Sequence, residues 1–114
     1  MITVKRVYEA PAKSDGFRII ADRLWPRGLS RDKAKVDTWL KDVAPSDDLR
    51  KWFGHNPQKW AEFKERYFQE LETKGHFVDS IAQKAARGRV TLLYGAKNRE
   101  FNNAVALKEY IETK

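Results

Sequence analysis

The order of apolar and polar positions along the chain predicts three β-strands. Residues 2–7 alternate apolar and polar side chains, which is typical of a strand with one buried face. Residues 17–21 are more continuously apolar, which indicates a central strand, and residues 89–94 form the third predicted strand. The pattern therefore predicts a sheet with strands from both halves of the chain.

Apolar residues at helical spacing predict five helices, at about 30–44, 46–53, 57–74, 77–87 and 101–111. Serine or asparagine residues suitable as N-caps precede several of them, and glycine or proline residues mark their ends. The first of these helices is predicted from four apolar residues on one face: Val36, Trp39, Leu40 and Val43.

Strands that alternate with helices indicate an α/β fold. The second and third strands are separated by several helices and are therefore predicted to be parallel. The direction of the first strand stays open, because the loop after it is too short for a helical crossover. We expect one domain over residues 1–114, with a small, mostly parallel sheet of three or more strands covered by helices. It is predicted to be Rossmann-like without the glycine-rich dinucleotide fingerprint.

The composition excludes several kinds of site. The chain has no cysteine, which excludes disulfides, thiolate nucleophiles and cysteine-based metal centres. The two histidines, His55 and His76, lie on different segments and cannot form a helical pair of metal ligands. No apolar run reaches membrane-spanning length, and no secretory leader is evident. We therefore expect a cytoplasmic protein without a metal, another cofactor or a membrane partner.

The formal net charge is +7 at pH 7 and is unevenly distributed. Residues 1–41 contain ten Lys and Arg against five acidic residues, residues 42–83 six against eight, and residues 84–114 seven against three. Two basic ends favour anionic partners such as nucleic acid, nucleotides or phosphorylated metabolites. The alternative is that the excess of basic residues only keeps the surface soluble.

Ligands of open parallel sheets bind outside the carboxyl ends of the strands. Here those ends are residues 22–27 and 94–99, and each carries two cations. The second loop also leads into a helix, whose N-terminal N–H groups and dipole favour an anion. We therefore predict that both loops line one pocket, which binds a phosphate or similar anion through four cations: Arg23, Arg27, Lys97 and Arg99.

Three further residues complete the predicted ligand set: Asp22, Trp25 and Asn102. Asp22 could act as a general acid or base, accept a ribose hydroxyl, or pair with Arg23, and the ion pair is the more common role. Trp25 is more typical of the core than of a ligand site. Asn102 can cap the last helix as well as bind a ligand, and His55 is a polar loop residue that could also face the site.

Several motifs spread over nearly the whole chain carry a family resemblance. They are Asp-Arg-Leu-Trp-Pro-Arg-Gly-Leu-Ser at 22–30, Lys-Arg-Val-Tyr at 5–8, Leu-Arg-Lys-Trp-Phe-Gly-His at 49–55, Thr-Leu-Leu-Tyr at 91–94 and Asn-Asn-Ala-Val at 102–105. With these motifs the chain resembles the YeaO-like proteins, which are small bacterial domains of unknown function.

The resemblance also implies what chemistry to expect. The wider group to which YeaO-like proteins are similar tends to place a Cys after the last strand and Cys-His-Arg at the start of the last helix. Tyr94 and the run Asn102, Asn103, Ala104 stand at those places here. Any reaction that depends on that thiol or imidazole is therefore expected to be lost.

These observations predict a domain that binds a phosphorylated or nucleotide-like anion with little or no catalysis. Two alternatives remain. One is a hydrolase or transferase on a nucleotide-type substrate, with Asp22 as acid or base, and the other is a sequence-independent nucleic-acid binder. Whether the protein is an enzyme stays open, although the resemblance favours a non-catalytic role. The pattern does not determine the oligomeric state.

Overall fold

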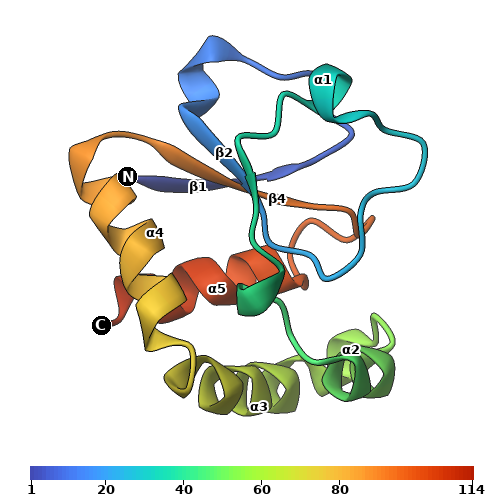
Figure 1. Cartoon of the computed structure of the whole chain (residues 1–114). Coiled ribbons are helices and arrows are strands. Elements are labelled where there is room, and N and C mark those ends of the chain that lie inside the picture. The colour runs from blue at the N-terminus through green and yellow to red at the C-terminus, as the bar shows by residue number, and fades with distance from the viewer.

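The computed structural model describes residues 1–114 and shows an α/β fold built on one parallel sheet. Its four strands are β1 (Ile2–Arg6), β2 (Phe17–Ile20), β3 (Thr38–Trp39) and β4 (Val90–Tyr94), in the spatial order β1-β4-β2-β3 (Figure 1). β4 lies between β1 and β2, and all five of its residues are buried. The predicted fold class is confirmed.

β1 runs parallel to β4, which answers the question of strand direction that the sequence left open. Its register runs from Ile2 beside Val90 to Arg6 beside Tyr94. β2 pairs in parallel with the other side of β4, as predicted, and with β3. Since all four strands point the same way, their carboxyl ends meet at one edge of the sheet.

Four longer helices match predicted ones: α2 (Asp47–Phe53), α3 (Trp60–Glu72), α4 (Gly75–Arg87) and α5 (Asn103–Glu112). Their apolar residues form one buried cluster with residues of β1, β2 and β4. Figure 1 shows α3, α4 and α5 together on one side of the strands. None of the helices combines the length and the apolar composition that a membrane span requires.

Local signals in the sequence set the ends of these helices. The Ser46 hydroxyl accepts a hydrogen bond from the Leu49 N–H (3.2 Å), and Gly54 ends α2 with a φ of 53°. The Asn56 side chain accepts a hydrogen bond from the Gln58 N–H (3.0 Å) just before α3. Such caps act within a few residues, which is why the sequence predicts them.

The prediction of a helix over 30–44 is wrong. The structure has a single helical turn there, α1 (Arg31–Ala34), which ends at Lys35 in a left-handed conformation with a φ of 48°. The chain then extends into β3 and a short 3₁₀ helix at Lys41–Val43. The four apolar residues that suggested one helix face therefore lie in or beside two different elements.

Long-range contacts explain this difference. Trp39 extends the sheet beside Ile20, and its indole packs against that of Trp25 with 5.4 Å between the ring centroids. The indole N–H of Trp39 also donates a hydrogen bond to the Asp22 carbonyl (2.9 Å). These contacts join segments that are far apart in the sequence, so helical periodicity alone cannot reveal them.

The other face of the sheet is covered by α1 and the loops beside it. A small cluster of Val7, Ile20, Ala34 and Leu93 is buried there, and half-buried aromatic residues of the segment 22–39 pack against it. Figure 1 shows α1 on the side of the sheet opposite to α5. The segment that follows β2 therefore crosses this face before the chain returns to form β3.

Candidate functional site

The carboxyl ends of β2 and β4 lie side by side, as the sequence predicts. The N–H of Ala21 donates a hydrogen bond to the Leu93 carbonyl (3.2 Å), and the N–H of Gly95 donates one to Asp22 Oδ2 (2.8 Å). The loops that follow the two strands therefore start from neighbouring points at one edge of the sheet. That edge is where ligands of parallel sheets bind.

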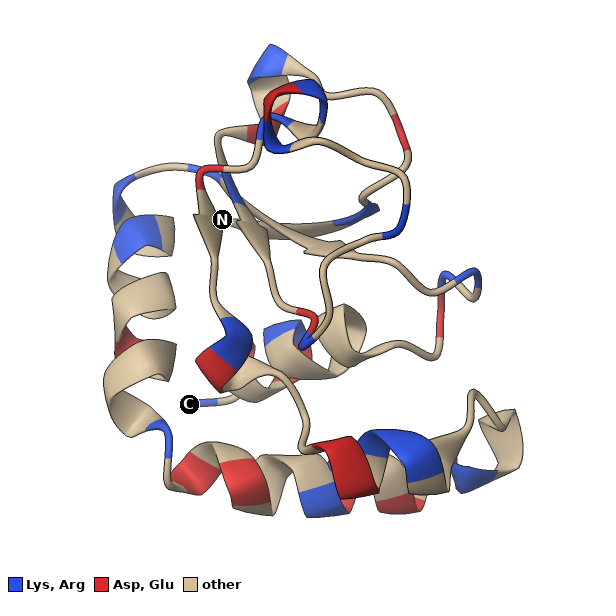
Figure 2. Cartoon of the chain, turned by 45° about the vertical axis from the view of Figure 1, so that its right-hand side comes forward, with Lys and Arg blue, Asp and Glu red and all other residues tan.

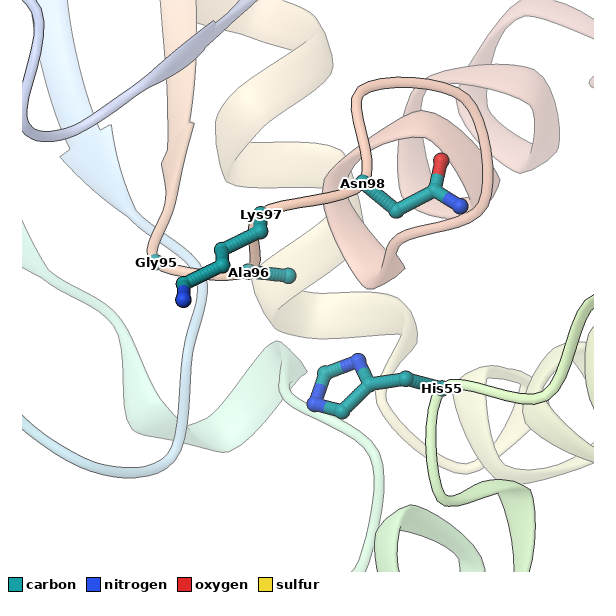
Figure 3. Close-up of a pocket in the computed structure, with 5 residues that line it drawn as sticks. All are labelled: His55, Gly95, Ala96, Lys97 and Asn98. Carbon is teal, nitrogen blue, oxygen red and sulfur yellow. The ribbon is translucent and has the colours of Figure 1, made fainter.

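A hollow of about 460 Å³, called the wide hollow below, opens between the loop after β4 and the turn that connects α2 with α3. Its lining residues are Gly95, Ala96, Lys97 and Asn98 of the loop and His55 of the turn. Figure 3 shows the His55 imidazole extending from its turn toward the loop that carries Lys97. The sequence left open whether His55 faces the site, and in the structure its side chain faces this loop.

A smaller hollow of about 50 Å³, called the narrow hollow below, shares His55 and Ala96 with the wide hollow. Its other lining residues are Pro45, Arg50, Phe53, Phe63, Asn102 and Asn103. The proline and the phenylalanine rings are apolar, whereas the guanidinium group and the two amides can form hydrogen bonds. The two hollows are thus adjoining spaces with different chemical character.

The loop after β4 contains main-chain donors without partners. The N–H groups of Ala96, Lys97 and Asn98 make no hydrogen bond within the protein, whereas those of Glu100 and Phe101 both bind Asn98 Oδ1 (2.8 and 3.0 Å). The Lys97 side chain is exposed and forms no ion pair. Consecutive free N–H groups beside an ammonium group are chemically suited to an anion.

Side chains from β1 and the start of α5 hold this loop in place. Arg6 Nε donates a hydrogen bond to the Ala96 carbonyl (3.0 Å), and Asn102 Nδ2 donates one to the Asn98 carbonyl (3.0 Å). These bonds use carbonyl oxygens of the loop and leave its free N–H groups unoccupied. The loop is therefore ordered without a ligand, which lowers the entropy that binding would cost.

The sequence favoured an ion pair between Asp22 and Arg23, but the structure does not contain this ion pair. Its Oδ2 atom accepts the Gly95 N–H, and its Oδ1 atom is buried without a hydrogen-bond partner. Burial raises the pKa of Asp22, against the opposing effects of the Asn103 amide, the Gly95 N–H and nearby cations. The carboxyl group is therefore poorly solvated and fixed next to the loop after β4.

The structure does not bring the four predicted cations together around one hollow, so that part of the prediction is wrong. Lys97 lines the wide hollow. Arg23 instead donates a hydrogen bond to the Pro45 carbonyl (3.1 Å), lies 3.9 Å from Asp47 Oδ1 and lines a different hollow beside α3.

Arg27 and Arg99 also do not line the wide hollow. Arg27 is exposed, and its main-chain carbonyl accepts a hydrogen bond from the Tyr8 hydroxyl (2.9 Å). Arg99 forms an ion pair with Glu9 (3.1 Å), which joins the loop after β4 to the segment after β1. Both arginines follow strands that end at the carboxyl edge of the sheet, but Arg99 is paired with Glu9 and the Arg27 side chain has no partner within the protein.

Trp25 explains why the two loops separate. It packs against Trp39 on the face of the sheet opposite the long helices, and its indole N–H donates a hydrogen bond to the Leu29 carbonyl (2.6 Å). The segment after β2 is thereby held on that face, away from the loop after β4. The sequence favoured a packing role for Trp25, and these contacts are of that kind.

Asparagines at and before the start of α5 shape the site in ways that the sequence predicts only in part. Asn102 accepts a hydrogen bond from the Val105 N–H (2.9 Å) and caps α5, as expected. Asn103 donates one to the Ala21 carbonyl (2.9 Å), and Asn98 orders the loop; neither role was predicted. The available signal was the concentration of asparagine between residues 98 and 103, since asparagine favours caps and turns.

Comparisons with known proteins agree with the resemblance. Residues 1–114 match the family model described as the inactive DUF488-N3 subclade. The uncharacterized protein YeaO of Escherichia coli (strain K12) is 39% identical over 112 residues, which are 98% of this chain and 97% of YeaO. The uncharacterized protein Rv3073c of Mycobacterium tuberculosis (strain ATCC 25618 / H37Rv) is 34% identical over 110 residues, 96% of this chain and 92% of Rv3073c. No solved structure matches the chain. The chain therefore belongs to the YeaO-like family, in the inactive DUF488-N3 subclade.

Proposed function

We propose that this protein binds a small phosphorylated or nucleotide-like anion in the wide hollow, over the loop after β4, without transforming it. One observation carries the proposal. The N–H groups of Ala96, Lys97 and Asn98 are consecutive, have no partner within the protein and belong to a loop that lines the hollow. Loop N–H groups bind phosphate oxygens well when a nearby cation adds its charge, and Lys97 supplies that cation.

The surroundings of the loop support an anionic ligand. Lys97 has no carboxylate partner that would compete with a ligand, and His55 on the opposite wall can form a hydrogen bond to a ligand. α5 begins at Asn103, so the positive end of its dipole lies just beyond the loop.

The non-catalytic part of the proposal is supported by Tyr94 and by the family. Tyr94 stands where the resemblance places a Cys, and it is buried at the end of β4. Burial raises the pKa of the Tyr94 hydroxyl, and a neutral phenol is a poor nucleophile. The family description calls the subclade inactive, which points in the same direction.

Asp22 supports a second candidate function. A half-buried carboxyl with a raised pKa, held next to the loop after β4, is a candidate acid or base for a hydrolase or transferase acting on a nucleotide-type substrate. Incubation with nucleotides and phosphate esters, followed by phosphorus NMR, separates the two functions. Product formation that Asp22→Asn abolishes would favour the enzyme, and unchanged substrate would favour binding alone.

The charge distribution favours a small anion over nucleic acid. Figure 2 shows Lys and Arg interspersed with Asp and Glu on α2 and α3, along the lower edge of the view. A nucleic-acid strand needs several cations along its phosphates, and its affinity falls steeply with salt. A single phosphate needs only a few fixed donors.

Lys97→Ala tests the proposed function. We expect calorimetric titration with inorganic phosphate and adenosine monophosphate to give about five- to tenfold weaker binding for this variant, the loss of one charged donor. Lys33→Ala removes the same charge from α1, which lies on the opposite face of the sheet, and should leave the affinity unchanged. Equal losses in both variants, or tight DNA binding with a steep salt dependence, would contradict the proposal.

A further inference from the structure

A hollow separate from the proposed anion site lies beside α3. It measures about 540 Å³, a size typical of small-molecule sites, and is called the basic hollow below. Three cationic side chains line it: Arg23 of the segment after β2, Arg66 of α3, and Lys74 of the turn between α3 and α4. The carboxylate of Glu70 lines it as well. The basic hollow shares no lining residue with the wide hollow or the narrow hollow, so it is a distinct space.

Arg23 presents donors that the protein itself does not use. Its Nε atom donates a hydrogen bond to the Pro45 carbonyl (3.1 Å), which holds the guanidinium group in place. The Asp47 carboxylate lies 3.9 Å from Nε, too far for a hydrogen bond, and accepts one from Arg50 instead (3.3 Å). The two terminal nitrogens of Arg23 form no hydrogen bond within the protein, and neither is buried. They are therefore accessible to a ligand.

The other charged residues leave the basic hollow with more donors than acceptors. Glu70 forms no ion pair with the three cations, because its two oxygens accept the N–H (2.8 Å) and the hydroxyl (2.6 Å) of Ser46. Arg66 pairs with Glu62 through one terminal nitrogen, and its other nitrogens form no hydrogen bond. Lys74 forms no ion pair. Three cations therefore face one carboxylate that is already bound to the start of α2.

The donors of the basic hollow differ from those of the loop after β4. The main-chain N–H groups of Ser46, Thr73 and Lys74 are all bonded within the protein, so a ligand meets side-chain donors there. A guanidinium group presents parallel N–H groups in one plane, which match the two oxygens of a carboxylate. We propose that the basic hollow is a second binding site, for a small molecule with two or more carboxylate groups. One carboxylate binds the terminal nitrogens of Arg23, and the second balances the charge on the side of α3.

Succinate and butyrate test this proposal on the unaltered protein, because both are four-carbon chains and only succinate has a second carboxylate. In nitrogen-15 NMR titrations at constant ionic strength, succinate is expected to shift the amides of Gln69, Thr73 and Lys74 along one saturating curve. Succinate should bind at least about fivefold more tightly than butyrate, the gain from one more charge-assisted contact. Equal affinities, or no response of these amides to succinate, would overturn the inference.

Two variants test whether the cations of the basic hollow make this site. Arg23→Lys keeps the charge but loses the paired N–H groups, and it should weaken succinate binding about tenfold. Lys74→Ala should weaken it about threefold, and this change breaks no ion pair within the protein. Lys33→Ala, on the opposite face of the sheet, is the control and should leave the affinity unchanged. Losses of equal size in all three variants would overturn the inference.

This second site does not depend on the proposed function, because the two hollows have no lining residue in common. Phosphate shifts at residues 96–98 without a succinate response at Gln69, Thr73 and Lys74 would overturn only the second site. The opposite result would support the second site and contradict only the proposed function.

Discussion

At the scale of single residues, Asn98 determines the shape of the loop over which the anion is proposed to bind. Its Oδ1 atom accepts hydrogen bonds from the N–H groups of Glu100 and Phe101, and its carbonyl accepts one from Asn102 Nδ2. These bonds fix the end of the loop and leave the preceding N–H groups free. One side chain thus connects the local sequence with the geometry of the site.

Asn98→Ala is expected to weaken both the fold and the binding of phosphate. Two N–H groups lose their acceptor, so the free energy of unfolding should fall by about 1–2 kcal/mol in urea denaturation. The loop should also lose order, and phosphate affinity should fall. Ser30→Ala is the matched control, because Ser30 accepts the Lys33 N–H (3.2 Å) at the start of α1. Affinity losses of similar size in both variants would contradict the role of Asn98.

Asp15 should make stability depend on acid pH. Burial raises the pKa of Asp15, but the hydrogen bond from the Ala12 N–H and the contacts with Lys5 and Arg18 outweigh it, so the pKa lies below the ordinary 3.8. A carboxyl with a lower pKa in the folded state stabilises that state above its unfolded-state pKa. This contribution is lost as the pH falls through the folded-state pKa.

We therefore expect the free energy of unfolding to fall as the pH is lowered below 3.8, and Asp15→Asn to remove this part of the pH dependence. Urea denaturation of the unaltered protein and of Asp15→Asn across the acid pH range measures both pH dependences. An Asp15→Asn variant with the same acid dependence as the unaltered protein would show that Asp15 contributes nothing to it.

Residue roles that act locally could be predicted from the sequence, and those that depend on distant partners could not. The cap at Asn102 needs only the Val105 N–H three residues later. The partners of Arg23 and Asp22, by contrast, are Pro45 and Gly95, which come near only when the sheet has formed. The prediction of a pocket with four cations was wrong for this reason. The ends of neighbouring strands bring their main chains together, but they do not determine where long side chains point.

At the scale of elements, the same distinction separates the helices from β3. α2, α3, α4 and α5 follow the apolar periodicity and the caps of their own sequence. β3 forms because Trp39 pairs with Ile20 and its ring packs against Trp25. Neither contact is visible as a periodic pattern in the sequence of residues 30–44. Tertiary pairing outweighs a weak helical pattern in such a segment.

Gly16→Ala should disturb the junction between β2 and β4. Gly16 has a φ of 67°, and a Cβ atom there would lie 2.2 Å from the Arg89 carbonyl oxygen. That oxygen also accepts the Phe17 N–H (3.0 Å), so it cannot move freely. We expect the free energy of unfolding to fall by about 2–4 kcal/mol, from backbone strain and overpacking together.

Gly88→Ala is the control for this substitution. Gly88 precedes β4, has an extended φ of 177°, and has no atom within 4 Å of an added Cβ. The stability of the Gly88→Ala variant in thermal or urea denaturation should therefore differ little from that of the unaltered protein. Equal effects of the two substitutions would show that the close approach of Gly16 to Arg89 does not constrain the sheet.

At the scale of the whole molecule, alternation of strands and helices was enough to predict the α/β class and the parallel pairing of β2 with β4. The order β1-β4-β2-β3 was not predictable, because the loop between β1 and β2 carries no signal that β4 will lie between them. That order places the loop after β4 at the centre of the carboxyl edge. Arg6 of β1 and Asp22 after β2 reach it from its two sides.

The net charge of +7 has to be interpreted at this scale as well. Several cations near the proposed site already have partners, such as Arg99 with Glu9, while Lys97 has none. The overall charge can attract anions toward the protein, but it does not specify a site. Recognition is proposed to depend on the few donors of one loop.

The most direct test of the anion site is a nitrogen-15 NMR titration of the unaltered protein with inorganic phosphate. We expect the amides of Ala96, Lys97 and Asn98 to shift together along one saturating curve, because their N–H groups are free to bind phosphate oxygens. The amides of α1 should not respond, since α1 lies on the other face of the sheet. Large shifts spread over both basic ends of the chain, or none in residues 96–98, would contradict the proposed site.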